Sequence, residues 1–184
     1  IGSSAASDVY KRQENSLMTR ITGKQIRDNT VTGEDVNEST LILPQMYHSS
    51  ADYTTSSITY VSMPGRNNWT TGFTTRQHQQ IAPFDGKLVK VMLRPTNGDA
   101  SNSVMVQLRT NSNGNTIENP TTGGSITDFT LTCANNHSTV EFTVADNQGF
   151  ITKGHAFGFS LVKNSGGNYG HTNFVAVIEW DLGS

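Results

Sequence analysis

The residues that could support catalysis are scattered along the chain. Glu179 and Asp181 lie two residues apart, so on one face of a strand they could act as the paired carboxylates of a glycoside hydrolase. We favour the other interpretation, an exposed last strand whose charges prevent pairing with further strands. No phosphate-binding glycine loop, nucleophile elbow or zincin motif is present, and no metal-ligand spacing links the histidines. These are His48, His78, His137, His155 and His171. We predict no catalytic residue, metal or cofactor.

The single cysteine, Cys133, excludes a disulfide within the chain. It ends a Phe-Thr-Leu-Thr-Cys segment in which Phe129, Leu131 and Cys133 share one face of a predicted strand. We therefore expect a small buried residue and not a nucleophile or a metal ligand.

Two predicted loops combine aromatic and amide side chains, which suit binding better than catalysis. Flat aromatic faces and amide hydrogen bonds form a surface that fits sugars. The alternative is that Trp69 and Tyr169 cap the hydrophobic core. The candidate receptor-binding residues are Arg66, Asn67, Asn68, Trp69, Asn168, Tyr169 and His171.

Composition argues against several partners. The 184 residues carry a net charge of −2, and only 15% are charged. Nothing indicates a basic surface for nucleic acid or an anionic membrane. No apolar run approaches the roughly 18 residues of a membrane span, and no signal-peptide pattern is present at the start. We predict no nucleic-acid partner and no membrane insertion.

Residues 3–13 match the in-frame translation of a transposon-end adapter used in sequencing libraries. We interpret residues 1–17 as an artefactual or disordered tail, with a natural start at Met18 or a gene that continues upstream.

A ten-residue repeat follows, and apolar residues recur in it at every fifth position. This period fits neither a helix nor a strand, and two copies cannot cover their own apolar row. The candidate oligomerisation residues are Ile21, Ile26, Val31, Val36 and Leu41. We predict an arm over residues 18–40 for virion attachment or trimerisation, although an ordinary irregular arm is the alternative. Residues 41–53, with Pro44, are predicted to be a linker.

The repeat segment Ile-Thr-Gly-Lys-Gln-Ile-Arg-Asp-Asn-Thr-Val-Thr-Gly-Glu-Asp-Val resembles short repeats near the N-termini of bacteriophage tail-fibre and other virion proteins. The resemblance covers about 21 residues, and similar repeats occur in bacterial surface proteins. It implies a homotrimer whose N-terminal part attaches to the particle.

From residue 54 to 182 the pattern is one of short strands separated by Gly, Asn and Pro turns. It predicts an all-β fold, a jelly-roll-like β-sandwich of about eight antiparallel strands, following the extended repeat arm. The expected strands cover residues 57–63, 71–80, 86–94, 103–110, 125–134, 138–144, 155–163 and 173–181. Two further segments, 81–91 and 150–161, resemble strands of jelly-roll knobs in phage fibres.

Alternation within these strands predicts one core. Its expected members are Val104, Val106, Leu108, Phe129, Leu131, Val140, Phe142, Phe157, Phe159 and Leu161. If eight strands each cross the sandwich, Trp69 and Tyr169 lie at one end, far from Thr54 and Leu182.

These features together favour a virion structural protein on the particle surface, either a tail fibre or a capsid decoration or head fibre. Its expected partners are two further copies of the chain, other virion proteins and a host-surface glycan. A bacterial carbohydrate-binding β-sandwich module is the alternative, and a glycan hydrolase is third.

Overall fold

The computed structural model describes residues 41–183, apart from 54–56, 65–68, 99–102, 113–114, 121–123 and 166–167. The tail of residues 1–17 and the arm of residues 18–40, with Ile21, Ile26, Val31 and Val36, lie outside the described residues.

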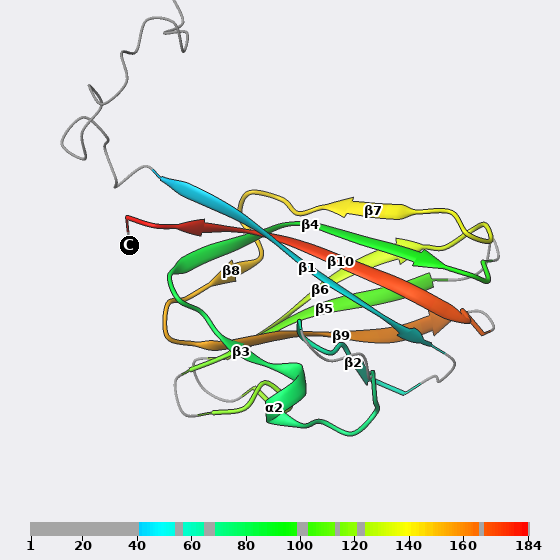
Figure 1. The fold of residues 1–184 in the computed structure, drawn as a ribbon, viewed down its shortest axis with the longest axis horizontal. Coiled ribbons are helices and arrows are strands. Elements are labelled where there is room, and N and C mark those ends of the chain that lie inside the picture. Colours follow the sequence, from blue (N-terminus) through cyan, green and yellow to red (C-terminus); the bar gives the residue numbers. More distant parts are fainter. Residues whose placement is uncertain are drawn as a thin grey trace, which may run out of the picture. The chain divides into compact units, whose positions relative to one another are not determined.

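Two antiparallel sheets pack face to face (Figure 1). One has the strand order β1-β10-β4-β7, and β8 also pairs with β4. The other has the order β2-β9-β5-β6, and β3 also pairs with β9. A one-turn helix, α2, precedes β3. The elements are β1 (Ile42–Asp52), β2 (Thr59–Tyr60), α2 (Thr75–His78), β3 (Gln80–Ile81), β4 (Asp85–Pro95), β5 (Ser103–Asn111), β6 (Ser125–Thr132), β7 (Val140–Thr143), β8 (Phe150–Ile151), β9 (Ala156–Ser165) and β10 (His171–Asp181).

The pairing is nested from the ends of the domain inward. β1 pairs with β10, β2 and β3 pair with β9, β4 pairs with β7 and β8, and β5 pairs with β6. A long hairpin rolled up on itself gives this order, and two sheets joined in this way form a jelly roll. The predicted all-β sandwich is confirmed, with eight strand positions when β2 and β3, and β7 and β8, each share one position.

Two expected elements were wrong, and the errors cancel in the strand count. Residues 41–53 do not form a linker, because Ile42–Asp52 is an 11-residue strand paired with β10 along its whole length. Residues 71–80 do not form a strand, because α2 occupies the middle of that segment. β2 and β3, separated by α2, instead share one position beside β9. Pro44 misled the prediction, since proline is tolerated on an edge strand.

The inner faces of the two sheets form the predicted core. Eight of its ten expected residues are buried, and Val140 and Phe142 are partly buried and packed against them. The rings of Phe129 and Phe142 lie 5.5 Å apart and join the two sheets. Each buried side chain of this size contributes about 1.5–3 kcal/mol to folding.

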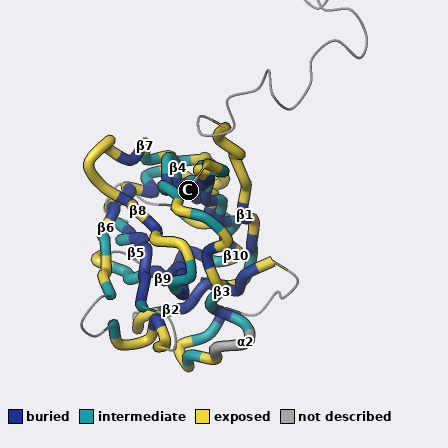
Figure 2. Tube along the Cα trace, turned by 90° about the vertical axis from the view of Figure 1, so that its left-hand side faces the viewer, coloured by how far each residue is buried: buried dark blue, intermediate teal, exposed yellow. Residues whose placement is uncertain are grey.

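The two outer faces differ. Loops and α2 cover the outer side of β9 and β5, and every residue of β9 from Ala156 to Leu161 is buried. No described segment covers the outer side of β1, β10 and β4. In Figure 2 the first half of β1 is exposed, while β5 is largely buried. We call these the covered face (the outer side of β9 and β5) and the open face (the outer side of β1, β10, β4 and β7).

Candidate functional site

The two aromatic residues expected to meet sugar are buried. The Trp69 side chain is 8% exposed, and its indole Nε1 donates to the Ser49 hydroxyl at 2.8 Å. Tyr169 is 1% exposed, and its hydroxyl donates to the Ser165 carbonyl at 2.8 Å. Both rings therefore cap the core, as in the alternative interpretation, and neither presents a stacking face to a ligand.

Tyr53 links these two rings into one cluster. Its ring stacks on Tyr169 with centroids 5.4 Å apart and meets Trp69 edge-on at 6.4 Å. Burial raises the pKa of Tyr169 to about 12 and also raises the pKa of Tyr53. The cluster closes one end of the sandwich with rings that remain neutral at physiological pH.

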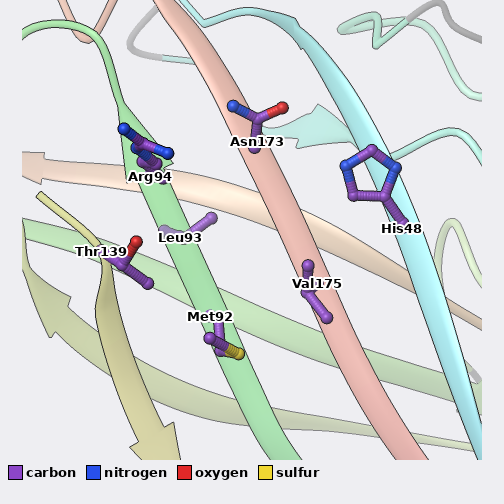
Figure 3. Close-up of a pocket in the computed structure, with 7 residues that line it drawn as sticks. All are labelled: His48, Met92, Leu93, Arg94, Thr139, Asn173 and Val175. Atoms are coloured by element: carbon purple, nitrogen blue, oxygen red, sulfur yellow. The ribbon is translucent and has the colours of Figure 1, made fainter. Parts of the chain in front are cut away.

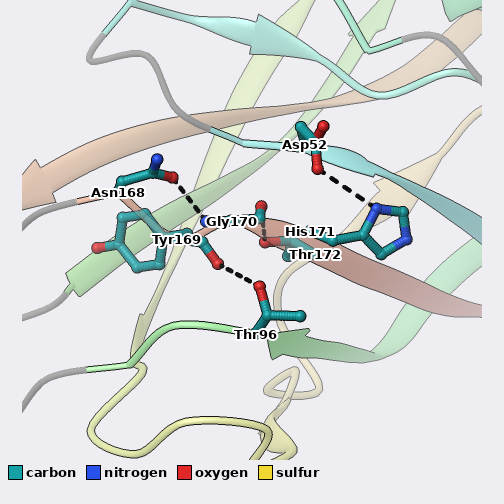
Figure 4. A network of polar contacts seen from close by, with 7 residues as sticks. All are labelled: Asp52, Thr96, Asn168, Tyr169, Gly170, His171 and Thr172. Carbon is teal, nitrogen blue, oxygen red and sulfur yellow. Dashed lines mark hydrogen bonds and ion pairs between the residues drawn. The ribbon is translucent and has the colours of Figure 1, made fainter.

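The polar residues near this cluster shape a turn (Figure 4). The Asn168 side-chain oxygen accepts the Gly170 N–H at 2.7 Å, and Gly170 has φ +62°. A side chain at Gly170 would collide with the Thr96 hydroxyl. His171 is exposed and lies 3.5 Å from the Asp52 carboxylate. Arg66, Asn67 and Asn68 lie outside the described residues.

The prediction about the two ends can be compared with the structure for Leu182, which lies among the described residues. Trp69 and Tyr169 do lie together, at the end of the sandwich opposite Leu182. Thr54 lies outside the described residues, but Tyr53 just before it contacts both rings. Tyr53 reaches this end because β1 begins beside the end of β10 and carries the chain across the sandwich.

The open face carries a depression of about 300 Å³ near this aromatic end (Figure 3). We call it the Arg94 depression. It is lined by His48 from β1, Asn173 and Val175 from β10, Met92, Leu93 and Arg94 from β4, and Thr139 just before β7. Strand register brings these side chains together, since His48 is opposite Val175, Val175 is opposite Met92, and Asn173 is opposite Arg94.

One contact orients Arg94. Its Nε–H donates to the His137 carbonyl at 2.9 Å. His137 has φ +56° and lies in the turn before β7. Within the described part of the chain, this carbonyl is the only hydrogen-bond acceptor for Arg94, and the terminal nitrogens are available for a ligand.

A second depression, of about 280 Å³, lies at the opposite end of the same face. We call it the Glu179 depression. Asp85, Glu179 and Asp181 line it together with the exposed apolar residues Ile42 and Phe150. The interpretation of Glu179 and Asp181 as charges on an edge strand was wrong, because β10 lies between β1 and β4. Lys87 also lines it and pairs with Asp146 at 2.8 Å.

Sequence reasoning missed a buried arginine under the loops of the covered face. Arg109 is 3% exposed, and its guanidinium donates to Ser160, Gln107 and the carbonyls of Ile117 and Glu118. It also lies over the Tyr60 ring, 5.4 Å from the centroid. These contacts join the loop after β5 to the sheet.

The remaining chemistry of the described residues is limited. Cys133 is buried as predicted, and burial raises the pKa of its thiol to about 11, which disfavours the reactive thiolate. No three His, Cys, Asp or Glu residues in the described ranges are grouped closely enough to hold a metal. Across the same residues, no helix has the length and apolar character needed to cross a membrane.

Comparison with protein-family models and with curated proteins found no match to this chain.

Proposed function

We propose that this chain is a structural protein of a bacteriophage virion, a jelly-roll knob that displays its open face on the particle surface. Its work is binding, to virion subunits at the end where the chain enters the knob and to host-surface glycan elsewhere. The proposal includes both forms considered from the sequence, a tail fibre and a capsid decoration or head fibre.

One observation carries the proposal. The apolar row of the repeat reaches Leu41, and the chain continues directly into exposed apolar residues on β1. Ile42 is 59% exposed and Met46 is 67% exposed, and Leu43 between them is also exposed. Soluble domains that act alone seldom leave such a run uncovered, so a run at the start of the knob supports contact with further copies of the chain.

The outer edge of β1 supports a closed assembly over an open-ended one. The Leu41 carbonyl accepts a hydrogen bond from the N–H of Leu182, just after β10, and the Tyr53 N–H donates to the Gly170 carbonyl, just before β10. Odd-numbered residues of β1 therefore face β10, and even-numbered ones direct their backbone groups outward. Pro44 is one of these outward residues and has no N–H. The edge cannot offer a continuous ladder of donors, which disfavours indefinite strand addition.

The alternative of a carbohydrate-binding module is favoured by one observation, the Arg94 depression, whose polar side chains surround an apolar floor. The two functions differ in assembly. A fibre or decoration protein is expected to be a trimer, whereas a sugar-binding module acts as a monomer.

Light scattering of the full chain tests the proposal, with Ile42→Asp and Met46→Asp as interface variants. We expect a homotrimer that both substitutions weaken, because each buries a charge in the contact between copies. Ile126→Asp is the matched control, since Ile126 is exposed on β6 in the other sheet. A monodisperse monomer for the unaltered chain would overturn the trimer. Genes for portal, tail or capsid proteins beside this gene are expected, and their absence would count against a virion.

A further inference from the structure

The Arg94 depression has the parts of a small-ligand site, and they come from separate segments of the chain. Asn173 from β10 and Arg94 from β4 lie opposite each other in the sheet. His48 from β1 and Thr139 before β7 complete the rim (Figure 3). All four side chains carry hydrogen-bonding groups. Three of them are on paired strands, which hold a ligand more precisely than a loop does, and Thr139 immediately precedes β7.

The charge of this depression is one-sided. Its lining includes an arginine and a histidine and no acidic residue. The acidic residues nearest in register each have a partner, since Glu141 is 3.4 Å from Lys90 and Asp52 is 3.5 Å from His171. The Glu179 depression on the same face has three carboxylates. An anionic ligand is therefore favoured at the Arg94 end and repelled at the other.

The floor of the depression is apolar. Met92 and Val175 lie side by side in register, between the polar groups of the rim. Such a floor suits the C–H face of a pyranose ring, while the Asn173 amide and the Thr139 hydroxyl suit ring hydroxyls. About 300 Å³ is at the lower limit for ligand pockets and fits one sugar unit.

We propose that the Arg94 depression binds a sugar that carries a carboxylate, with the Arg94 guanidinium holding the carboxylate and the Met92–Val175 floor receiving the ring. The terminal nitrogens of an arginine match a carboxylate in a two-bond arrangement. The inference rests on the proposed function, because it names the class of host-surface glycan that the knob recognises. The site lies toward the end of β1 remote from Leu41, where the knob is free to meet a host surface.

Ligand-observed NMR on the full chain tests the site with methyl glucuronide and methyl glucoside, which share a ring and differ in the carboxylate. We expect saturable binding of the glucuronide and at least about tenfold weaker binding of the glucoside, the usual effect of losing a charge-assisted contact. A methyl sialoside arm distinguishes a uronic acid from a sialic acid as the source of the carboxylate. Acetate tests a bare anion site, and binding of acetate as strong as that of the glucuronide would overturn the role of the ring.

Arg94→Gln provides the structural test, with Lys87→Gln as the matched control. Both remove one positive charge from β4 on the open face, but Lys87 lines the Glu179 depression at the opposite end. We expect Arg94→Gln to weaken glucuronide binding at least about tenfold and Lys87→Gln to leave it unchanged. Equal losses would show general electrostatic attraction and overturn the site, as would the absence of saturable binding to any probe. Light scattering on the same samples separates the two proposals. A trimer that binds no acidic sugar overturns only the site, whereas a monomer that binds it overturns only the virion assembly.

Discussion

The two outer faces of this sandwich show how the same strand pattern can lead to opposite environments. Arg94 on β4 and Arg109 on β5 both point away from the core between the sheets. Arg94 is exposed on the open face, while Arg109 is buried beneath the loops of the covered face. Alternation along a strand decides which sheet face a residue occupies, but distant segments decide whether that face meets water.

The covered face has to satisfy its polar groups without water. Arg109 loses solvation, and this burial lowers the pKa of its guanidinium. Four hydrogen-bonding partners and the Tyr60 ring compensate, among them two carbonyls of the loop after β5. On the open face, solvent supplies most of the hydrogen-bond partners of the Arg94 guanidinium. Polar residues therefore hold the loops in place on one face and remain available for ligands on the other.

Replacing each arginine with methionine gives the largest expected contrast. Arg109→Met should lower the free energy of unfolding by about 3–5 kcal/mol, because it leaves buried carbonyls and the Gln107–Ser160 pair without their donor. Arg94→Met should change it by less than about 0.5 kcal/mol. Urea unfolding followed by circular dichroism measures both. Losses of similar size would contradict the contrast between a buried Arg109 and an exposed Arg94.

A second contrast concerns how closely the loops approach the covered face. A side chain at Gly158 on β9 would collide with the His78 carbonyl and the Ile117 side chain, which belong to the covering segments. Gly158→Ala should cost about 1–3 kcal/mol, since one of these segments must move.

Gly72 is the matched control for this contrast, because a side chain there meets only the Thr70 hydroxyl at 3.9 Å. Gly72→Ala should be neutral or stabilising by up to about 1 kcal/mol. Thermal unfolding of the two variants compares them, and an unaffected melting temperature for Gly158→Ala would contradict the close packing of the loops.

Local patterns predicted the interior well and its coverings poorly. The alternation of Val104, Val106 and Leu108 identified the core face of β5, because every second residue of this strand packs against the other sheet. The same alternation assigned Gln107 and Arg109 to the opposite face, which was correct, but their burial depends on loops distant in sequence. The sequence of β5 alone therefore cannot predict that Gln107 and Arg109 are buried.

The site was predictable only in part for a related reason. Trp69 and Tyr169 were expected at one end of the sandwich, and the structure brings them together around Tyr53. Their burial depends on β1, which was predicted to be a linker because it contains Pro44. The Arg94 depression was not predicted, because it draws single residues from strands far apart in the chain, and only the nested pairing makes those strands neighbours.

Tyr53 and Tyr169 provide the smallest and most discriminating test. Both side chains are buried at the aromatic end of the sandwich. The Tyr169 hydroxyl donates to Ser165, whereas the Tyr53 hydroxyl has no hydrogen-bond partner among the described residues. Tyr169→Phe should therefore cost about 1 kcal/mol, while Tyr53→Phe should be neutral or stabilising, since it removes a buried polar group that is not paired.

The pH dependence of the same variants makes the test stricter. Burial raises the pKa of Tyr169 to about 12 from a value of 10.0 in the unfolded chain. Between these values the unfolded chain loses its phenolic proton first, so the stability due to the neutral ring is present below about pH 10 and is lost as pH rises toward 12. Phenylalanine does not ionise, and the deficit of Tyr169→Phe relative to the unaltered chain should shrink as pH increases. Tyr53→Phe should gain relative stability over the same range, because burial raises the pKa of Tyr53 as well. Urea midpoints at neutral and alkaline pH measure this. If both stability differences stay constant with pH, the two hydroxyls ionise as readily in the folded protein as in the unfolded chain, and this end of the sandwich is as accessible to water as the open face.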